Sequence, residues 1–149
     1  MDAAIERFVL DLLADHDVMT LATVREDGYP QATTVAYVND RLVLYFGCGG
    51  DSQKVHNIRR CDKVSLTIDR DYPNWNDIRG LSMGARAAVV TDPEERRRVG
   101  ELMMRKFPVI AEFASADDMQ TMAVVRVTPE VISVLDYSKG FGHTDLVTP

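Results

Sequence analysis

The first residues of the chain alternate between apolar and polar side chains with the period of an α-helix. Ile5, Phe8 and Leu12 recur at helical spacing, and Asp2 stands where a helix N-cap is expected. The pattern predicts one amphipathic helix over residues 3–14. Its apolar face has to pack against another element, which we expect to be a sheet.

After this helix, the alternation changes to the period of a β-strand. Strand-like segments cover residues 18–25, 31–38 and 41–47, and the turn signals Glu26–Pro30 and Asn39–Asp40 separate them. This spacing predicts three antiparallel strands that follow one another as a meander.

The second half of the chain contains longer strand patterns. Residues 63–69 alternate cleanly, and residues 78–91 form a long pattern interrupted by Gly80 and Gly84. Glycines inside a strand often mark a bulge or a bend, and closure of a barrel demands such curvature. Residues 122–135 predict the closing strand or pair of strands.

Helix signals fill the segments between these strands. A short helix follows Ser52, and Asp92 with Pro93 starts a longer one that Pro108 ends. About six strands with two or three flanking helices indicate a mainly β fold. We predict a single domain over residues 1–149, built as a six-stranded, mainly antiparallel closed or split β-barrel.

Charge and composition exclude several classes of function. The net charge of −6 argues against a nucleic-acid partner, which needs a basic surface. No apolar run reaches the roughly 18 residues that span a bilayer, so we expect no membrane partner. The acidic N-terminus lacks the features of a signal peptide, which predicts a cytoplasmic location. The cysteines and histidines show no metal-ligand spacing, and we predict no metal site.

One glycine-rich segment, residues 47–54, has the composition of a phosphate-binding loop. Glycines let backbone N–H groups turn toward a ligand, and the start of the following helix favours negative charge. Ser52 and Gln53 add hydrogen-bond donors, and Lys54 adds a full charge. The alternative is a plain connection between a strand and a helix, with Ser52 as an ordinary N-cap.

No catalytic constellation accompanies this loop. The sequence has no nucleophile elbow, no Walker A loop and no dinucleotide fingerprint. A barrel with a phosphate loop and no catalytic side chains suggests that a cofactor carries the chemistry.

The order of these motifs resembles the FMN-binding split-barrel family related to pyridoxamine 5′-phosphate oxidase. The resemblance rests on the segment LATVREDGYPQATTVAYVNDRLVLYFGCGGDSQKVHNI, on IRGLSMGARAAVVTDPEE and on DYSKGFGHTDLV near the C-terminus. It implies a split barrel that binds FMN, and oxidoreductase chemistry carried by the flavin.

The resemblance also implies which residues form the flavin site. One flavin-lining strand corresponds to Thr33, Thr34 and Val35, and a second contact corresponds to Phe46, Gly47 and Cys48. The phosphate grip corresponds to Ser52, Gln53 and Lys54. These nine residues are called the predicted flavin residues below.

Two departures from the family pattern matter. Gln53 stands where the oxidase has an arginine, and Arg59, Arg79 and Arg86 are candidates to replace that charge. The segment with which the oxidase holds its pyridoxine substrate has no match in this chain. The resemblance therefore implies FMN binding by an oxidoreductase on an unidentified small molecule, and not the oxidase reaction itself.

The sequence is also compatible with two other hypotheses. One is a non-catalytic flavin-binding, storage or sensor protein. The other is a relative that uses deazaflavin or haem, for which His143 is the candidate axial ligand.

A small barrel is filled by its own side chains, so a flavin has to sit outside it. We therefore predict a homodimer that builds the flavin site from both chains, as the resemblance also implies. The tail from Tyr137 to Thr144 is the segment expected to reach the partner, with Phe141 as an aromatic surface. The alternative is a frayed C-terminus.

Overall fold

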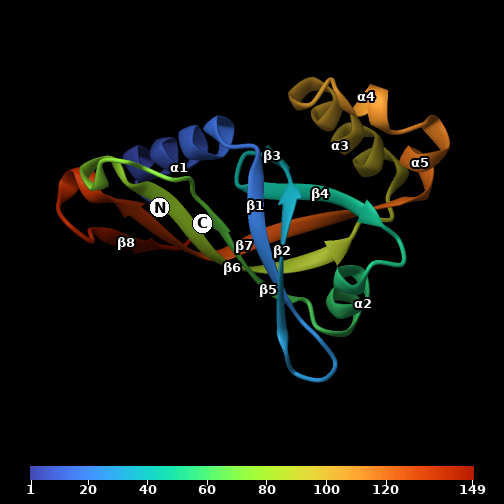
Figure 1. Ribbon diagram of the computed structural model, residues 1–149, viewed down its shortest axis with the longest axis horizontal. Coiled ribbons are helices and arrows are strands. Elements are labelled where there is room, and N and C mark those ends of the chain that lie inside the picture. The colour runs from blue at the N-terminus through green and yellow to red at the C-terminus, as the bar shows by residue number, and fades with distance from the viewer.

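The computed structural model describes residues 1–149 as one curled antiparallel sheet with helices around it (Figure 1). The strands are β1 (Val18–Val24), β2 (Pro30–Ala36), β3 (Val38–Asp40), β4 (Val43–Gly49), β5 (Lys63–Ile68), β6 (Arg79–Val89), β7 (Met122–Asp136) and β8 (Thr144–Val147). Their order in the sheet is β2-β1-β5-β6-β7-β4-β3, and β8 pairs with β7. The predicted mainly β split barrel is confirmed.

Helices lie at both ends of this sheet (Figure 1). They are α1 (Ala3–Asp15), α2 (Gln53–Arg60), α3 (Pro93–Lys106), α4 (Ile110–Phe113) and α5 (Ala116–Thr121), with short 3₁₀ turns η1 (Trp75–Asp77) and η2 (Tyr137–Lys139). The Asp2 carboxylate accepts from the amides of Ala4 and Ile5, which confirms the predicted start of α1. None of the helices has both the length and the apolarity that a membrane span requires.

The long strands β6 and β7 carry the curvature. Gly84 pairs with Val131 and Ala85 pairs with Pro129, so Glu130 is an extra residue on β7. The bulge therefore lies beside Gly84, where the sequence predicted a bulge or bend, although the inserted residue is on β7 and not on β6. β7 is one continuous strand through Pro129 and not a pair of strands.

The predicted number of six strands is wrong, because the structure has eight. The segment expected as one strand over 31–38 is divided at Tyr37, whose amide donates to Asp17 O and whose hydroxyl donates to Leu13 O. These bonds hold Tyr37 in the core, so that β2 pairs with β1 whereas β3 pairs with β4. The predicted meander is wrong for the same reason, because β2 does not pair with β4. The eighth strand lies in the tail, where no periodicity indicated it.

Two apolar clusters fill the molecule. The larger one lies between the sheet and α1, and includes Leu13, Leu21, Phe46 and Leu66. The smaller one lies under α3 and includes Val99 and other buried residues. A hydrogen bond from Tyr45 to Glu95 ties α3 to the sheet beside this second cluster.

Candidate functional site

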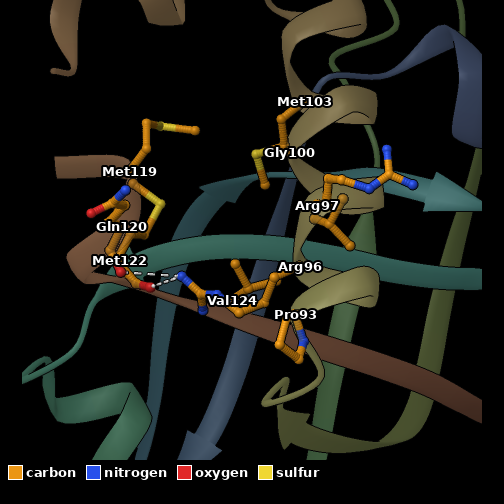
Figure 2. A pocket seen from close by; sticks show the side chains of 10 residues that line it. Pro93, Arg96, Arg97, Gly100, Met103, Met119, Gln120, Met122 and Val124 are labelled. Atoms are coloured by element: carbon orange, nitrogen blue, oxygen red, sulfur yellow. Dashed lines mark hydrogen bonds between the residues drawn. The ribbon is translucent and has the colours of Figure 1, made fainter. Parts of the chain in front are cut away.

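A cavity of about 620 Å³ lies between α3, α5 and the start of β7 (Figure 2). None of the nine predicted flavin residues lines it. The cavity comes close to the predicted flavin residues at one point. Met122 pairs with Gly49 across β4 and β7, and its side chain reaches Gly47, where an added Cβ would overlap the Met122 sulfur. The predicted flavin residues therefore define a different place on the molecule.

That place is a seam along which β2 lies beside β4 without hydrogen-bonding to it. β2 is the last strand of the sheet on its side and pairs only with β1. β3 covers only residues 43–45 of β4, which leaves the edge of residues 46–49 unpaired. Main-chain N–H and C=O groups on two strand edges are thus available to a ligand at this seam.

The structure brings the predicted strand residues to this seam with different exposures. Thr33 and Val35 are half-buried, whereas Thr34 points to the outer face of the sheet and is exposed. Gly47 and Cys48 are half-buried on β4. The Phe46 side chain is completely buried in the core, so only its main chain can face a ligand.

The seam continues into the N-terminus of α2. Ser52 is the N-cap residue, but its side chain makes no cap hydrogen bond and its hydroxyl donates to Cys48 Sγ at 3.5 Å. Lys54 is half-buried, and its ammonium group makes no hydrogen bond or ion pair within the chain. The helix start therefore keeps its partial positive charge beside a lysine with no counter-ion.

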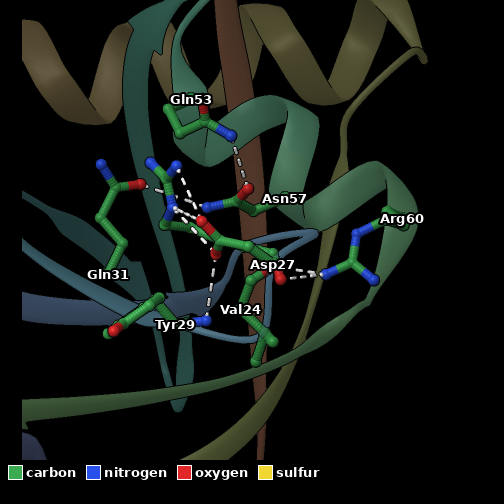
Figure 3. Close-up of polar contacts among 8 residues, drawn as sticks. Val24, Asp27, Tyr29, Gln31, Gln53, Asn57 and Arg60 are labelled. Carbon is green, nitrogen blue, oxygen red and sulfur yellow. Dashed lines mark hydrogen bonds and ion pairs between the residues drawn. The ribbon is translucent and has the colours of Figure 1, made fainter.

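A buried amide fixes the side chains around this helix start (Figure 3). Asn57, which is 1% exposed, accepts from Gln53 Nε2 at 2.8 Å. Its Nδ2 donates to Thr23 Oγ1 at 2.9 Å and to Gln31 Oε1 at 3.2 Å. Asn57 thus joins α2 to β1 and β2, and it orients Gln31 and Gln53 on either side of the seam.

Asn57 and Gln31 were missed by the sequence analysis. A signal for Asn57 was present, because it lies between the buried residues Val55 and Ile58 on a short helix. A polar side chain on such a face needs hydrogen-bond partners. Gln31 had no such signal, since its role depends on a partner 26 residues away in the sequence.

Arg25 is a further cation near the seam. A surface hollow of about 380 Å³ is lined by Arg25, Glu26, Asp27 and Gln53. Asp27 holds the Arg25 guanidinium at 3.2 Å, and this hydrogen bond raises the pKa of Arg25 and lowers the pKa of Asp27. Arg60 donates to the carbonyls of Val24 and Arg25 and so fixes this end of the β1–β2 hairpin (Figure 3).

The three arginines suggested by the sequence have other positions. Arg86 binds Asp62 and Glu130, and Arg79 bonds to the Asp77 carbonyl at the start of β6. Arg59 lies in the last turn of α2, away from its N-terminus. Arg25 is therefore the arginine that shares a hollow with Gln53.

The tail folds back on its own chain. η2 follows β7, and β8 then pairs with residues 132–135 of β7. Phe141 is 84% exposed and stacks on Trp75 with ring centroids 6.3 Å apart. His143 Nε2 lies 3.0 Å from the Asp145 carboxylate. The tail is thus a paired strand with an exposed aromatic pair, and not a frayed end.

The curled sheet and its seam define this chain as a split-barrel protein. It belongs to the pyridoxamine 5′-phosphate oxidase family, because the model of that family matches residues 5–136. The resemblance inferred from the sequence is thereby confirmed. None of the curated proteins compared with the chain matches it.

Solved structures support the same fold. A putative pyridoxamine 5′-phosphate oxidase from Listeria innocua is 25% identical with a TM-score of 0.73, covering 89% of this chain and 98% of its own. A conserved hypothetical protein from Mycobacterium tuberculosis is 25% identical with a TM-score of 0.79, covering 97% and 91%. The haem storage protein HutZ from Vibrio cholerae is 19% identical with a TM-score of 0.70, covering 84% and 89%, and shares the fold alone.

Proposed function

We propose that this protein binds FMN along the seam and acts as a flavin-dependent oxidoreductase on a small molecule. The observation that carries the proposal is the end of the seam at α2. There, two unpaired strand edges lead to a helix start without a side-chain cap, beside a lysine without a counter-ion. A planar ring with polar edges and a phosphate at one end fits such a donor set.

The phosphate would be held by Ser52, Gln53 and Lys54. The amides at the helix start and the Ser52 hydroxyl donate hydrogen bonds, and Lys54 supplies the charge. Gln53 stands where the oxidase has an arginine and carries no charge, but its side-chain amide is oriented by the hydrogen bond to Asn57. Arg25, which lines a hollow together with Gln53, supplies a second cation.

The ring would lie against the main chain of Thr33, Thr34 and Val35 and of Phe46, Gly47 and Cys48. FMN, when bound, supplies hydride or electron transfer, which the chain's own side chains do not. The role of the protein itself is to bind and orient the ring through main-chain groups. These groups carry no charge and do not titrate, so they keep the same hydrogen-bonding pattern over a wide pH range.

The outer face of β2, β1 and β5 supports a homodimer. Thr34, Thr20 and Thr67 lie in one row across these strands, and all three are exposed. Their exposed neighbours Val18, Ala32, Ala36 and Ser65 are uncharged as well, and Lys63 at the start of β5 is a charged residue at the margin of this face. An outer sheet face in water normally carries charged side chains, whereas a flat uncharged face suits a self-complementary two-fold interface.

In this dimer, the partner would cover the side of the flavin that the seam leaves open. The exposed pair of Trp75 and Phe141 is the part of the tail region available for this contact. η2 and β8 hold the tail against β7, and Phe141 is the exposed aromatic side chain at its tip.

The visible spectrum of the purified protein tests the proposal. Two flavin bands in the blue are expected, followed by bleaching with NADH or NADPH. A protein that loads with FMN and is reduced by no donor corresponds to a flavin store or sensor. A Soret band would indicate haem, and a single dominant band a deazaflavin. For haem, His143 would have to leave Asp145, with which it already interacts. The cytoplasmic location stays a prediction, which cell fractionation tests.

A further inference from the structure

The cavity between α3 and α5 is lined mainly by apolar side chains that the flavin proposal does not use. Met103 on α3, Met119 on α5 and Met122 at the start of β7 face it, with Val124 behind them (Figure 2). Methionine side chains are flexible and adapt to ligands of different shape. The volume of about 620 Å³ is in the range of small-molecule sites.

Gly100 indicates that this space is kept open. It lies in the middle of α3 and lines the cavity, and an added Cβ would meet no atom within 4 Å. Contact with neighbouring atoms therefore does not require a glycine here. Glycine destabilises a helix interior relative to alanine. The glycine at position 100 therefore lowers the stability of α3, and neither helix formation nor packing requires it. A larger side chain at this position would project into the cavity.

Arg96 gives the cavity a charge. Its Nη2 donates to Met122 O at 2.9 Å and to Gln120 O at 3.4 Å, which places the half-buried guanidinium at the wall (Figure 2). No carboxylate pairs with Arg96, whereas the adjacent Arg97 pairs with Glu94 and Glu101. The cavity lining contains no acidic residue. A half-buried cation with no counter-ion favours an anionic ligand.

From these three observations, we propose that this cavity is a second binding site, for a small carboxylate with an apolar body. The methionine wall and the space over Gly100 take the apolar part, and Arg96 takes the carboxylate. The inference does not depend on the flavin site, because none of the predicted flavin residues lines this cavity.

The test uses 2-naphthoate as probe and 2-naphthamide as its neutral counterpart, on the full chain labelled with ¹³C at its methionine methyl groups. Naphthoate is expected to shift the methyl signals of Met103, Met119 and Met122, and to leave those of Met19 and Met83 in the core unchanged. Calorimetry is expected to show weaker binding of the amide.

Two variants and one control separate the roles. Arg96→Gln should weaken naphthoate binding about ten- to a hundredfold and remove its advantage over the amide. Gly100→Leu should abolish binding of both probes while the protein stays folded by circular dichroism. Arg105→Gln, on the same helix but outside the cavity lining, should bind like the wild type.

Several results would overturn the inference. They are unchanged methyl signals of the three cavity methionines, equal affinity of the wild type for acid and amide, or unchanged binding by a folded Gly100→Leu variant. Competition between naphthoate and FMN would also overturn it, since the probe would then occupy the flavin site. FMN binding by Gly100→Leu should equal that of the wild type, so failure of this inference and failure of the flavin proposal are distinguishable.

Discussion

Asn57 on α2 donates a hydrogen bond of 3.2 Å to Gln31 on β2, and so links the two sides of the candidate flavin site. The same amide is bonded to Thr23 and Gln53, and it is almost completely buried. The geometry of the seam is therefore coupled to the stability of the fold.

We expect Asn57→Ala to lower the free energy of unfolding by about 1–3 kcal/mol, because it leaves buried polar groups without a partner. FMN affinity should fall in the same variant, since Gln31 and Gln53 lose the group that orients them. Urea denaturation and flavin fluorescence measure the two effects. His56→Ala, on the exposed side of the same helix, is the control and should change stability by less than about 0.5 kcal/mol. Equal stability of the two variants would contradict the role given to Asn57.

Lys54→Ala should weaken FMN binding by about 1.5–3 kcal/mol, or roughly ten- to a hundredfold, because a charge-assisted contact to the phosphate is lost. Riboflavin has no phosphate, so its affinity should change little. Arg25→Ala should show the same selectivity with a smaller effect, since Asp27 already neutralises part of its charge.

Arg59→Ala is the control for both variants, because Arg59 lies at the other end of α2. Titrations of FMN and riboflavin by fluorescence quenching give the comparison. If Lys54→Ala weakens both ligands equally, the phosphate lies elsewhere.

Thr20→Glu should disrupt the proposed dimer, because it places a charge in the middle of an uncharged outer face in both copies at once. Thr20 is not one of the predicted flavin residues, so the change tests the interface and not direct contact with the ring. Sedimentation velocity at micromolar concentration is the measurement. A monomeric wild-type FMN complex would rule out the shared site, and Thr91→Glu on another part of the surface should leave the dimer intact.

Phe141→Ala tests the part of the tail that projects from the molecule. Truncation after Asp136 would remove β8, which pairs with β7, and would therefore change the fold together with the contact. The point substitution removes only an exposed ring that stacks on Trp75. We expect weaker FMN binding with unchanged thermal stability. Wild-type affinity in this variant would mean that the tail has no part in the flavin site.

Glu95 makes the stability of the α3 contact depend on pH. Hydrogen bonds from Arg126 at 2.7 and 2.9 Å are the main cause that lowers the pKa of Glu95 below its ordinary value of 4.5, and the Tyr45 hydroxyl assists. Since the folded state has the lower pKa, the stabilisation is present above 4.5 and is lost as the pH falls through the folded value.

The wild type should thus be more stable than Glu95→Gln at neutral pH, and the difference should shrink as urea denaturation is repeated at lower pH. Glu26→Gln changes an exposed glutamate without a hydrogen-bond partner and serves as the control. A difference that is constant with pH would show that Glu95 does not act through its charge.

The elements that could be predicted from the sequence are those set by local pattern. Asp2 caps α1 as expected, β5 alternates as expected, and the bulge lies beside Gly84. The division of a predicted strand at Tyr37 could not be foreseen, because it depends on bonds to Leu13 and Asp17 that only the folded chain forms.

The same distinction applies to the candidate site. The loop from Gly47 to Lys54 was recognisable, since its glycines and its lysine are contiguous in the sequence. Arg25 and Gln31 approach α2 only when the β1–β2 hairpin folds over it, so no local pattern marks them. The cavity at Gly100 is likewise formed by α3, α5 and β7, which are separate in the sequence.

The most direct test of the flavin site is the change in backbone amide shifts when FMN is added to the ¹⁵N-labelled protein. The largest changes should fall on residues 33–35, 46–48 and 52–54, and riboflavin should reproduce the first two groups but not the third. Changes confined to other elements, or equal changes at 52–54 with both ligands, would contradict the placement of FMN along the seam.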